Sequence, residues 1–347
     1  MKIAVIGAGV HGASAALALT DRGHEVTIFE QHAFGHRHGS SHGRSRIIRK
    51  AYPDPFYTAI MQTGYPMWAE LQQRTKQPIV FESGLLFVGR SDSEQVQSVV
   101  SSLTTEAVPF TLQSPEEARI LHGMILQPGE VAIFTPDGGW VHADHAVATM
   151  IALAQAQGAH VRQVRVGDPV ALRQEFDAVV LAPGAWIQQF VPELDVEVRV
   201  QTVAYIRGSY HGPAWIEDGP GMIYGFPNAP GENSVKIGVH TRGSAWDLES
   251  ERPPLDENEI SVLLDAAARR FGIENSEVEE TLTCLYTCTP DEDFRWGELA
   301  DRVFWVSACS GHGFKFGPWI GSQMADFCEG ISSPNSIPRF CPKLALQ

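Results

Sequence analysis

The stretch KIAVIGAGVHGASAALALTDRGHEVTIFE, residues 2–30, decides the fold of this chain. Its apolar run at 3–6 is typical of a parallel strand that is buried on both faces. An Ala- and Leu-rich segment, 13–22, predicts a helix that ends before the next glycine. A second apolar run at 26–29 predicts another strand. The chain therefore opens with a strand, a glycine-rich turn, a helix and a strand.

Three glycines and one acid give this unit the pattern of a dinucleotide-binding site. Gly7, Gly9 and Gly12 permit a tight turn, the close approach of a pyrophosphate and the packing of helix on strand. The helix N-terminus offers free amides to phosphates. Glu30 follows Gly12 by 18 residues, where a carboxylate can hold a ribose hydroxyl. The pattern favours dinucleotide binding over a plain βαβ turn, but it does not separate FAD from NAD.

Composition excludes several classes of protein. The 347 residues suggest about two domains. A net charge of −15 argues against a general nucleic-acid binder, whose footprint would be basic. No apolar stretch of about 20 residues occurs, so we expect no membrane span. The five cysteines are odd in number and lie late in the chain, so we expect a reducing, cytoplasmic compartment.

Residues 31–53 are strongly basic within this acidic chain. They hold no acid, and their glycines and serines suggest a loop that wraps a ligand. Two interpretations stay open: a solvated loop, or an anion site for a cofactor or a carboxylate substrate. No carboxylate or cysteine accompanies the histidines, so we predict no metal site. The basic residues are Arg37, Arg44, Arg46, Arg49 and Lys50.

Two further glycine-rich turns follow expected strands. The strand at 178–182 runs into a turn that contains Gly184, and the strand at 303–307 runs into a loop and then a helix from about 317. Such sites suit a large, flat dinucleotide, so FAD fits better than NAD. We therefore expect an α/β fold of two domains. The cofactor domain comprises 1–82, 143–204 and 284–347, and the inserted substrate domain, with an antiparallel sheet, comprises 83–142 and 205–283.

Five sequence blocks occur in one order along the chain. They are the glycine motif with Glu30, GSSHGRSRIIRKAY at 39–52, YGFP leading to KIGVH at 224–240, CLYTCTPDE at 284–292, and SGHGFK at 310–315. Together they resemble the monomeric sarcosine oxidase family of covalent-FAD amine oxidases, which includes pipecolate and N-methyltryptophan oxidases. The resemblance covers nearly the whole chain and implies a Rossmann-like FAD domain with an inserted substrate domain.

The resemblance implies how FAD is held. Cys284 matches the cysteine that carries the flavin through a thioether, whereas Cys288 and Cys309 are interpreted as packing residues. A thiolate is the nucleophile that such a bond requires, and nearby cations favour it. The remaining cofactor contacts are expected at Gly7, Gly9, Gly12, Glu30, Ser40, Gly184, Gly311 and Gly313.

The resemblance also implies a reaction. A small secondary amino acid, such as sarcosine or L-pipecolate, loses a hydride to the flavin, the imine is hydrolysed, and O₂ becomes H₂O₂. Arg49 and Lys315 match a clamp for the substrate carboxylate. Lys236, beside Arg46, matches the fixed charge that assists oxygen reduction. His42, Tyr224 and His240 match residues that orient the substrate.

Plainer interpretations compete with these roles. Lys236 alone reads as a strand-edge lysine on a solvated face, and His240 as a core histidine. A flavin dehydrogenase that uses another electron acceptor, an N-methyltryptophan-type oxidase, a nicotinamide dehydrogenase and a non-catalytic binding protein are the rival functions. We further expect a monomer, and a pocket wall at Trp215 that would favour small substrates.

Overall fold

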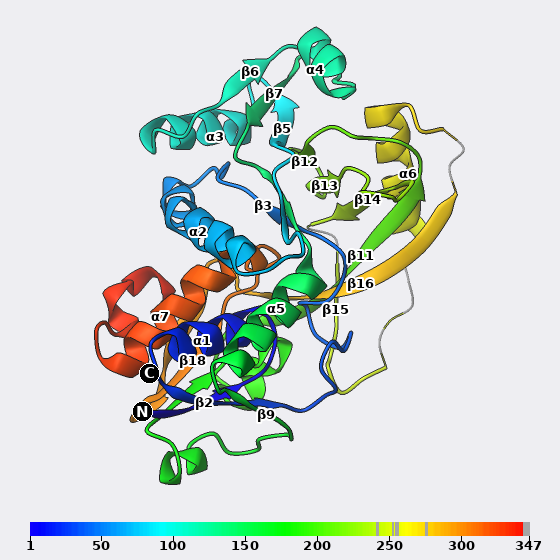
Figure 1. Cartoon of the computed structure of the whole chain (residues 1–347). Helices are drawn as coiled ribbons and strands as arrows, with labels where there is room; N and C mark the ends of the chain where they lie inside the picture. Colours follow the sequence, from blue (N-terminus) through cyan, green and yellow to red (C-terminus); the bar gives the residue numbers. More distant parts are fainter. Residues whose placement is uncertain (241–242, 252, 254–256, 275–276, 343–347) are drawn as a thin grey trace.

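The computed structural model describes residues 1–240, 243–251, 253, 257–274 and 277–342. Two large sheets dominate the chain, and a small three-stranded sheet joins them (Figure 1). The expected α/β architecture, a Rossmann-like unit with an inserted antiparallel sheet, is confirmed.

The first sheet is the dinucleotide-binding unit. Its strand order is β17-β18-β10-β1-β2-β9, and all neighbours pair in parallel except the edge strand β17. Alternate residues of β1 enter two different apolar cores, one on each face, which explains the unbroken apolar run. The strands are β1 (Lys2–Ile6), β2 (Glu25–Glu30), β9 (His160–Gln163), β10 (Ala178–Leu181), β17 (Arg295–Ala300) and β18 (Val303–Ser307).

Helices from three parts of the chain pack together on one face of this sheet. α1 (Val10–Asp21) contacts both α5 (Ala143–Ala156) and α7 (Gly317–Glu329), and α2 (Pro55–Gln73) packs against α7. The expected helix at 13–22 thus begins three residues earlier. Gly9 is its N-cap, with an extended backbone, so the last residues of the glycine motif already form the first helical turn.

The second sheet is largely antiparallel and carries most of the catalytic candidates. Its path is β15-β11-β14-β13-β12-β5-β7-β6, with β16 paired to β11, and only β12 and β5 run in parallel. The strands are β5 (Leu85–Arg90), β6 (Thr111–Gln113), β7 (Glu130–Thr135), β11 (Glu197–Arg207), β12 (Ala214–Glu217), β13 (Ile223–Phe226), β14 (Ser234–Val239), β15 (Ser244–Ala245) and β16 (Val278–Cys288).

Smaller elements complete this half. α6 (Glu257–Phe271) packs on β11 and β14, α3 (Glu94–Thr105) on β5 and α4 (Pro115–His122) on β6 and β7. A third sheet, in the order β3-β8-β4, joins the two halves through Arg46–Ile48, Gly139–Val141 and Val80–Phe81. Both β11 and β16 cross the expected domain boundaries near 204 and 283. No described helix combines the length and the apolar character needed to cross a membrane.

Candidate active site

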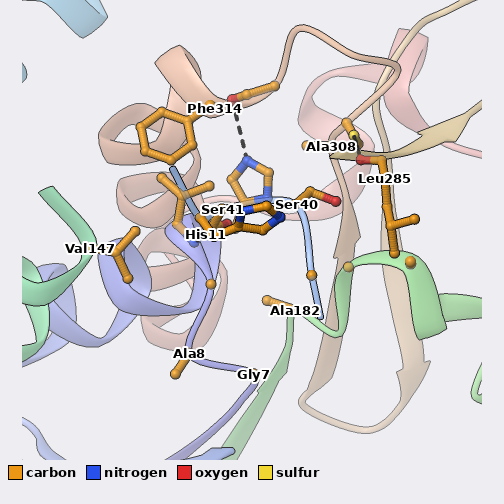
Figure 2. A pocket seen from close by; sticks show the side chains of 18 of the residues that line it. Gly7, Ala8, His11, Ser40, Ser41, Val147, Ala182, Leu285, Ala308 and Phe314 are labelled. Carbon is orange, nitrogen blue, oxygen red and sulfur yellow. Dashed lines mark hydrogen bonds between the residues drawn. The ribbon is translucent and has the colours of Figure 1, made fainter. Parts of the chain in front are cut away.

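One cavity of about 860 Å³ lies between the two large sheets. Figure 2 shows how the turn at Gly7 and Ala8, the loop at Ser40 and Ser41, and the late segment at Ala308 and Phe314 converge on it. Of the residues expected in the site, Gly12 and Lys236 are not part of the cavity wall. The others all line the cavity: Gly7, Gly9, Glu30, Ser40, His42, Arg46, Arg49, Gly184, Tyr224, His240, Cys284, Gly311, Gly313 and Lys315.

The glycine turn holds the start of α1 open toward the cavity. A Cβ on Gly12 would lie 1.8 Å from the Gly7 carbonyl oxygen, so this position admits no side chain. Gly7 has φ +96°, and a Cβ there would lie 2.3 Å from the Ala182 oxygen. Around Gly9 the nearest atom is only the Ser41 hydroxyl at 3.1 Å. Packing therefore fixes two of the glycines, and open space beside the third suits a phosphate.

Glu30 is buried at the end of β2 and held by hydrogen-bond donors. Its carboxylate accepts from the backbone N–H groups of Ala8 (2.9 Å) and His32 (3.0 Å), and lies 3.4 Å from His36 Nε2. Burial raises the pKa of Glu30, but these donors outweigh burial and bring it to about 2. The carboxylate therefore stays ionised and can accept from a ribose hydroxyl.

Arg46 holds the basic loop together through hydrogen bonds to its backbone. Its guanidinium donates to three carbonyl oxygens of the loop itself, those of Ser40 (2.9 Å), His42 (2.7 Å) and Ser45 (2.8 Å). It also lies 3.4 Å from the sulfur of Cys284. The loop is thus wrapped around a cation at the cavity wall, which favours the anion-site interpretation at this end of the stretch.

One face of four neighbouring strands carries the catalytic candidates. Lys236 on β14 pairs with Tyr205 on β11 and with Phe226 on β13, and paired residues share a face. Along β13, β14 and β16, alternate positions point the same way. Gly238 leaves room here, because a Cβ on it would lie 2.7 Å from the hydroxyl of Tyr224. This face therefore presents a lysine, a tyrosine and the thiol of Cys284 to one region.

Lys236 is a buried cation, not a solvated strand-edge lysine. It is 4% exposed, and its Nζ donates to the Ser45 carbonyl at 2.9 Å. Burial and, to a smaller extent, the neighbouring Arg46 lower the pKa of Lys236 to about 7. The ammonium also lies 4.9 Å from the ring centroid of Phe226.

Arg49 and Lys315 meet at the other end of the same wall. Lys315 Nζ donates to the Tyr52 hydroxyl (2.9 Å) and the His312 carbonyl (2.7 Å), while the Arg49 guanidinium lies 3.9 Å from the centroid of the Tyr52 ring. Burial lowers the pKa of both cations. In the part of the chain that the structure describes, no carboxylate forms an ion pair with either. This pair therefore suits a carboxylate that comes from outside the chain.

His240 and two tyrosines form the wall between the cations. Burial and, to a smaller extent, the charges of Arg49 and Lys315 lower the pKa of His240 to about 4, so the imidazole is neutral at pH 7. The side chains of Tyr224 and Tyr286 influence each other's pKa, and burial raises the pKa of both hydroxyls. The rings of His240 and Tyr286 lie 5.5 Å apart between centroids. A neutral, polar wall can orient an amine without adding a charge.

The cysteines differ in their access to the cavity. Cys284 is buried at the wall beside Arg46. Cys309, expected only to pack, also lines the cavity, with its sulfur 3.9 Å from the Leu285 oxygen. Cys288 is absent from the described cavity wall, and burial raises its pKa to about 12. Cys284 is thus the thiol with a cation in contact.

The expectation for Trp215 is wrong. On β12 it points away from the cavity and packs with Phe271 of α6, with ring centroids 4.7 Å apart, while its neighbour Ile216 faces the cavity. The sequence assigned no role to several residues that build the site. The period-2 pattern after Cys284 could have indicated Tyr286, but no local signal marked Tyr52, Ser41 or His312.

The residues at both ends of the cavity fit FAD. One end offers the glycine cradle and Glu30, as a nucleotide requires, and the other offers Arg46 and Cys284. His11 connects the glycine motif to the late loop, because its Nε2 lies 3.4 Å from the Gly313 oxygen (Figure 2). FAD, if bound, would be held by these groups. No three described His, Cys, Asp or Glu side chains are arranged to hold a metal ion.

Comparisons with known proteins agree with this geometry. Residues 2–327 match the family described as DAO, FAD dependent oxidoreductase. Peroxisomal sarcosine oxidase of Homo sapiens is 29% identical over 97% of this chain and 95% of that protein. Monomeric sarcosine oxidase of Streptomyces avermitilis is 30% identical over 98% and 97%. The structure of NikD, an unusual amino acid oxidase, has the same fold, with a TM-score of 0.84, 22% identity and coverage of 99% and 98%.

Proposed function

Because the chain belongs to the FAD dependent oxidoreductase family, we propose that it oxidises a small secondary amino acid, such as sarcosine or L-pipecolate, with O₂ as acceptor. The names of its sarcosine oxidase relatives support this substrate class. The observation that carries the proposal is the arrangement of four cations, Arg46, Arg49, Lys236 and Lys315, around one cavity. Within the described chain, none of them has a carboxylate partner.

The two pairs of cations have separate tasks in this proposal. Arg49 and Lys315 bind the substrate carboxylate, and the neutral wall of His240 and Tyr224 faces the amine. A neutral imidazole there neither repels nor traps the amine, so the free base that must donate the hydride is not disfavoured. Bidentate binding by Arg49 fixes the orientation of the substrate.

FAD, when bound, would supply the two-electron oxidation of the CH–NH unit of the substrate. Arg46 and Lys236 place fixed positive charge where an oxygen anion develops, in a site that is shielded from water. The lowered pKa of Lys236, about 7, lets it carry this charge at neutral pH and also release a proton nearby. His42 completes the polar wall on this side of the cavity.

We further propose that FAD is attached through a thioether to Cys284. The contact of 3.4 Å between Arg46 and the Cys284 sulfur supports it, because it places this thiol beside a cation at the cavity wall. We also propose that the enzyme is monomeric and cytoplasmic. The five cysteines are free thiols in the structure, as is usual in a reducing compartment.

Two measurements on purified protein test the proposal. After acid precipitation, a covalent flavin stays with the yellow pellet, whereas a dissociable one stays in the supernatant. The protein is then mixed with sarcosine, L-pipecolate, L-proline and N-methyl-L-tryptophan, and peroxide is measured. Reduction of the flavin by a substrate without peroxide would identify a dehydrogenase. Preference for N-methyl-L-tryptophan would move the substrate to the aromatic class, and no flavin in either fraction would refute the proposal.

A further inference from the structure

Tyr205 is a buried tyrosine whose hydroxyl has no hydrogen-bond partner among the described residues. Tyr205 lies near the C-terminal end of β11 and is 2% exposed. A buried hydroxyl without a partner is costly, so a chain that keeps one inside normally gives it a polar ligand. Phenylalanine would fill the same space without that cost. The cost of burying this hydroxyl therefore indicates that it has a function.

The position of Tyr205 links it to the proposed oxygen site. It pairs with Lys236 across β11 and β14, so both side chains leave the sheet on the same face. The Lys236 ammonium lies 5.9 Å from the centre of the Tyr205 ring. Arg46, which contacts Cys284, acts electrostatically on the phenol as well.

A second layer of contacts holds the ring in place. The guanidinium of Arg44 lies 4.2 Å from the centre of the Tyr205 ring. Arg44 is itself fixed by ion pairs with Glu232, at 2.8 Å, and with Glu280, which is opposite Tyr205 on β16. Arg44 thus connects the Tyr205 ring with three segments: the basic loop, the β13–β14 connection and β16. The orientation of the phenol is set by three segments, as a positioned hydrogen-bond donor requires.

We propose that the Tyr205 hydroxyl is a further polar group of the oxygen site, where it donates a hydrogen bond to the small oxygen ligand held by Lys236 and Arg46. That ligand is water at rest and dioxygen during turnover, so the inference rests on the proposed acceptor. Overall, O₂ takes up two electrons from the reduced cofactor and two protons that solvent replaces, giving H₂O₂. Tyr205 keeps its own proton throughout and stabilises the developing charge.

The chemistry of the phenol agrees with this role. Burial raises the pKa of Tyr205 to about 12, although Arg44 and Arg46 oppose that rise, so the group stays protonated at neutral pH. As a neutral phenol, Tyr205 takes up no proton from the neighbouring arginines. It can donate one hydrogen bond to an anion. A structural tyrosine, by contrast, would leave the oxygen reaction unchanged when its hydroxyl is removed.

The test compares Tyr205→Phe with a matched control, Tyr65→Phe. Tyr65 also has a buried hydroxyl without a described partner and a cation nearby, with Lys50 Nζ 5.0 Å from the centre of its ring, but that cation is paired with Asp137, whereas no described carboxylate forms an ion pair with Lys236. We expect Tyr205→Phe to slow the reaction of the reduced enzyme with O₂ by roughly threefold to tenfold, the value of one hydrogen bond. Flavin reduction by substrate should stay unchanged, and Tyr65→Phe should resemble the original protein.

A structural readout accompanies the kinetics. Crystals of both variants and of the original protein are soaked in bromide, a heavy anion that marks sites between cations and hydrogen-bond donors. We expect an anomalous peak within hydrogen-bonding distance of the Tyr205 hydroxyl in the original protein and in Tyr65→Phe, and a weaker one in Tyr205→Phe. If Tyr205→Phe folds poorly, the position of bromide in the original protein decides the question.

The outcomes separate this inference from the proposed function. Unchanged oxygen kinetics in Tyr205→Phe, or equal slowing of both half-reactions, would overturn the role of Tyr205 while leaving the oxidase intact. Bromide elsewhere in the cavity would do the same. If the reduced original protein does not react with O₂ at all, O₂ is not the electron acceptor. The proposed role of Tyr205 in the oxygen site is then refuted as well.

Discussion

The two ends of the cavity are built in opposite ways. The nucleotide end is built mainly from one continuous stretch, residues 2–30, and uses glycines, backbone amides and a single acid. The catalytic end is assembled from segments spread from Arg46 to Lys315 and uses buried cations. The first end holds a constant part of the cofactor, so local backbone geometry is enough. The second must bind and stabilise several anions, which requires side chains from many places.

Their electrostatics differ in the same sense. At the nucleotide end, donors surround Glu30 and lower its pKa, so the carboxylate is satisfied within the chain. At the catalytic end, burial lowers the pKa of Lys236 and Lys315, the neighbouring Arg46 and Arg49 add to this effect, and no described carboxylate forms an ion pair with either lysine. The nucleotide end therefore needs no ligand to balance its buried charge, whereas the catalytic end is stabilised when an anion binds there.

The largest effect is expected at the nucleotide end, from Gly12→Ala. The added Cβ would lie 1.8 Å from the Gly7 oxygen, so strand and helix must separate, at a cost of about 3 kcal/mol or more. We expect little bound flavin and a clearly lower melting temperature. Gly167→Ala is the control, because nothing lies within 4 Å of its Cβ position. Equal flavin content in the two variants would show that the glycine cradle is not limiting.

The catalytic end gives an all-or-none prediction, Cys284→Ala. We expect complete loss of flavin from the acid-precipitated pellet, with the fold retained, because the thiol is small and lies at the cavity wall. Cys288→Ala is the control, since that thiol is absent from the described wall. Flavin that stays with denatured Cys284→Ala would move the attachment to Cys309, the other cysteine that lines the cavity.

Lys236→Met separates the two pairs of cations. Removing a preorganised charge at a developing anion costs about 3–4 kcal/mol, so reaction with O₂ should slow roughly a hundredfold to a thousandfold. Stopped-flow measurement of flavin reduction should show a much smaller change. Lys50→Met is the control, because Lys50 is paired with Asp137 at 2.7 Å outside the cavity wall. If both half-reactions of Lys236→Met slow equally, the lysine binds substrate or supports structure instead.

The sequence predicted the nucleotide end almost completely, because its signals are local. Strand, turn, helix and acid follow one another within 30 residues, and each keeps its place in the structure. Even there, the start of α1 was placed three residues late, since a helix can begin inside a glycine motif when an extended glycine caps it.

The catalytic end could be predicted from residues alone only in part. Lys236 reads as solvated until the loop at Ser45 is seen to cover it. Trp215 was assigned to the wrong face, because its four-residue strand is too short for an alternating pattern and has buried apolar residues on both faces. Tyr52 and Tyr205 matter only through contacts with segments far away in sequence. Resemblance to a family supplied the roles that no local pattern could.

Arg49→Ala tests the carboxylate clamp and should have a moderate effect. Lys315 remains, so we expect about 2 kcal/mol, or roughly a thirtyfold weaker binding of simple carboxylate inhibitors. Arg49→Lys should recover only part of the loss, because a point charge cannot replace the guanidinium fork. Arg37→Ala, in the same basic stretch but mostly exposed, is the control. Equal inhibitor affinities for the two alanine variants would refute the clamp.

The smallest effect is expected from Glu30→Gln, and it should depend on pH. The folded pKa of Glu30, about 2, lies below its ordinary value near 4.5. Its contribution to stability is therefore complete above about pH 4.5 and is lost as pH falls toward 2, because the unfolded chain takes up the proton first. At pH 7 the variant should lose about 1 kcal/mol, since an amide oxygen still accepts from Ala8 but without charge. Urea unfolding at pH 7 and pH 3 measures this, with Glu25→Gln, at the exposed start of the same strand, as control. A difference between Glu30→Gln and the original protein that stays constant over this range would mean that the donors around Glu30 do not act through its charge, and the electrostatic contrast between the two ends would then rest on the cations alone.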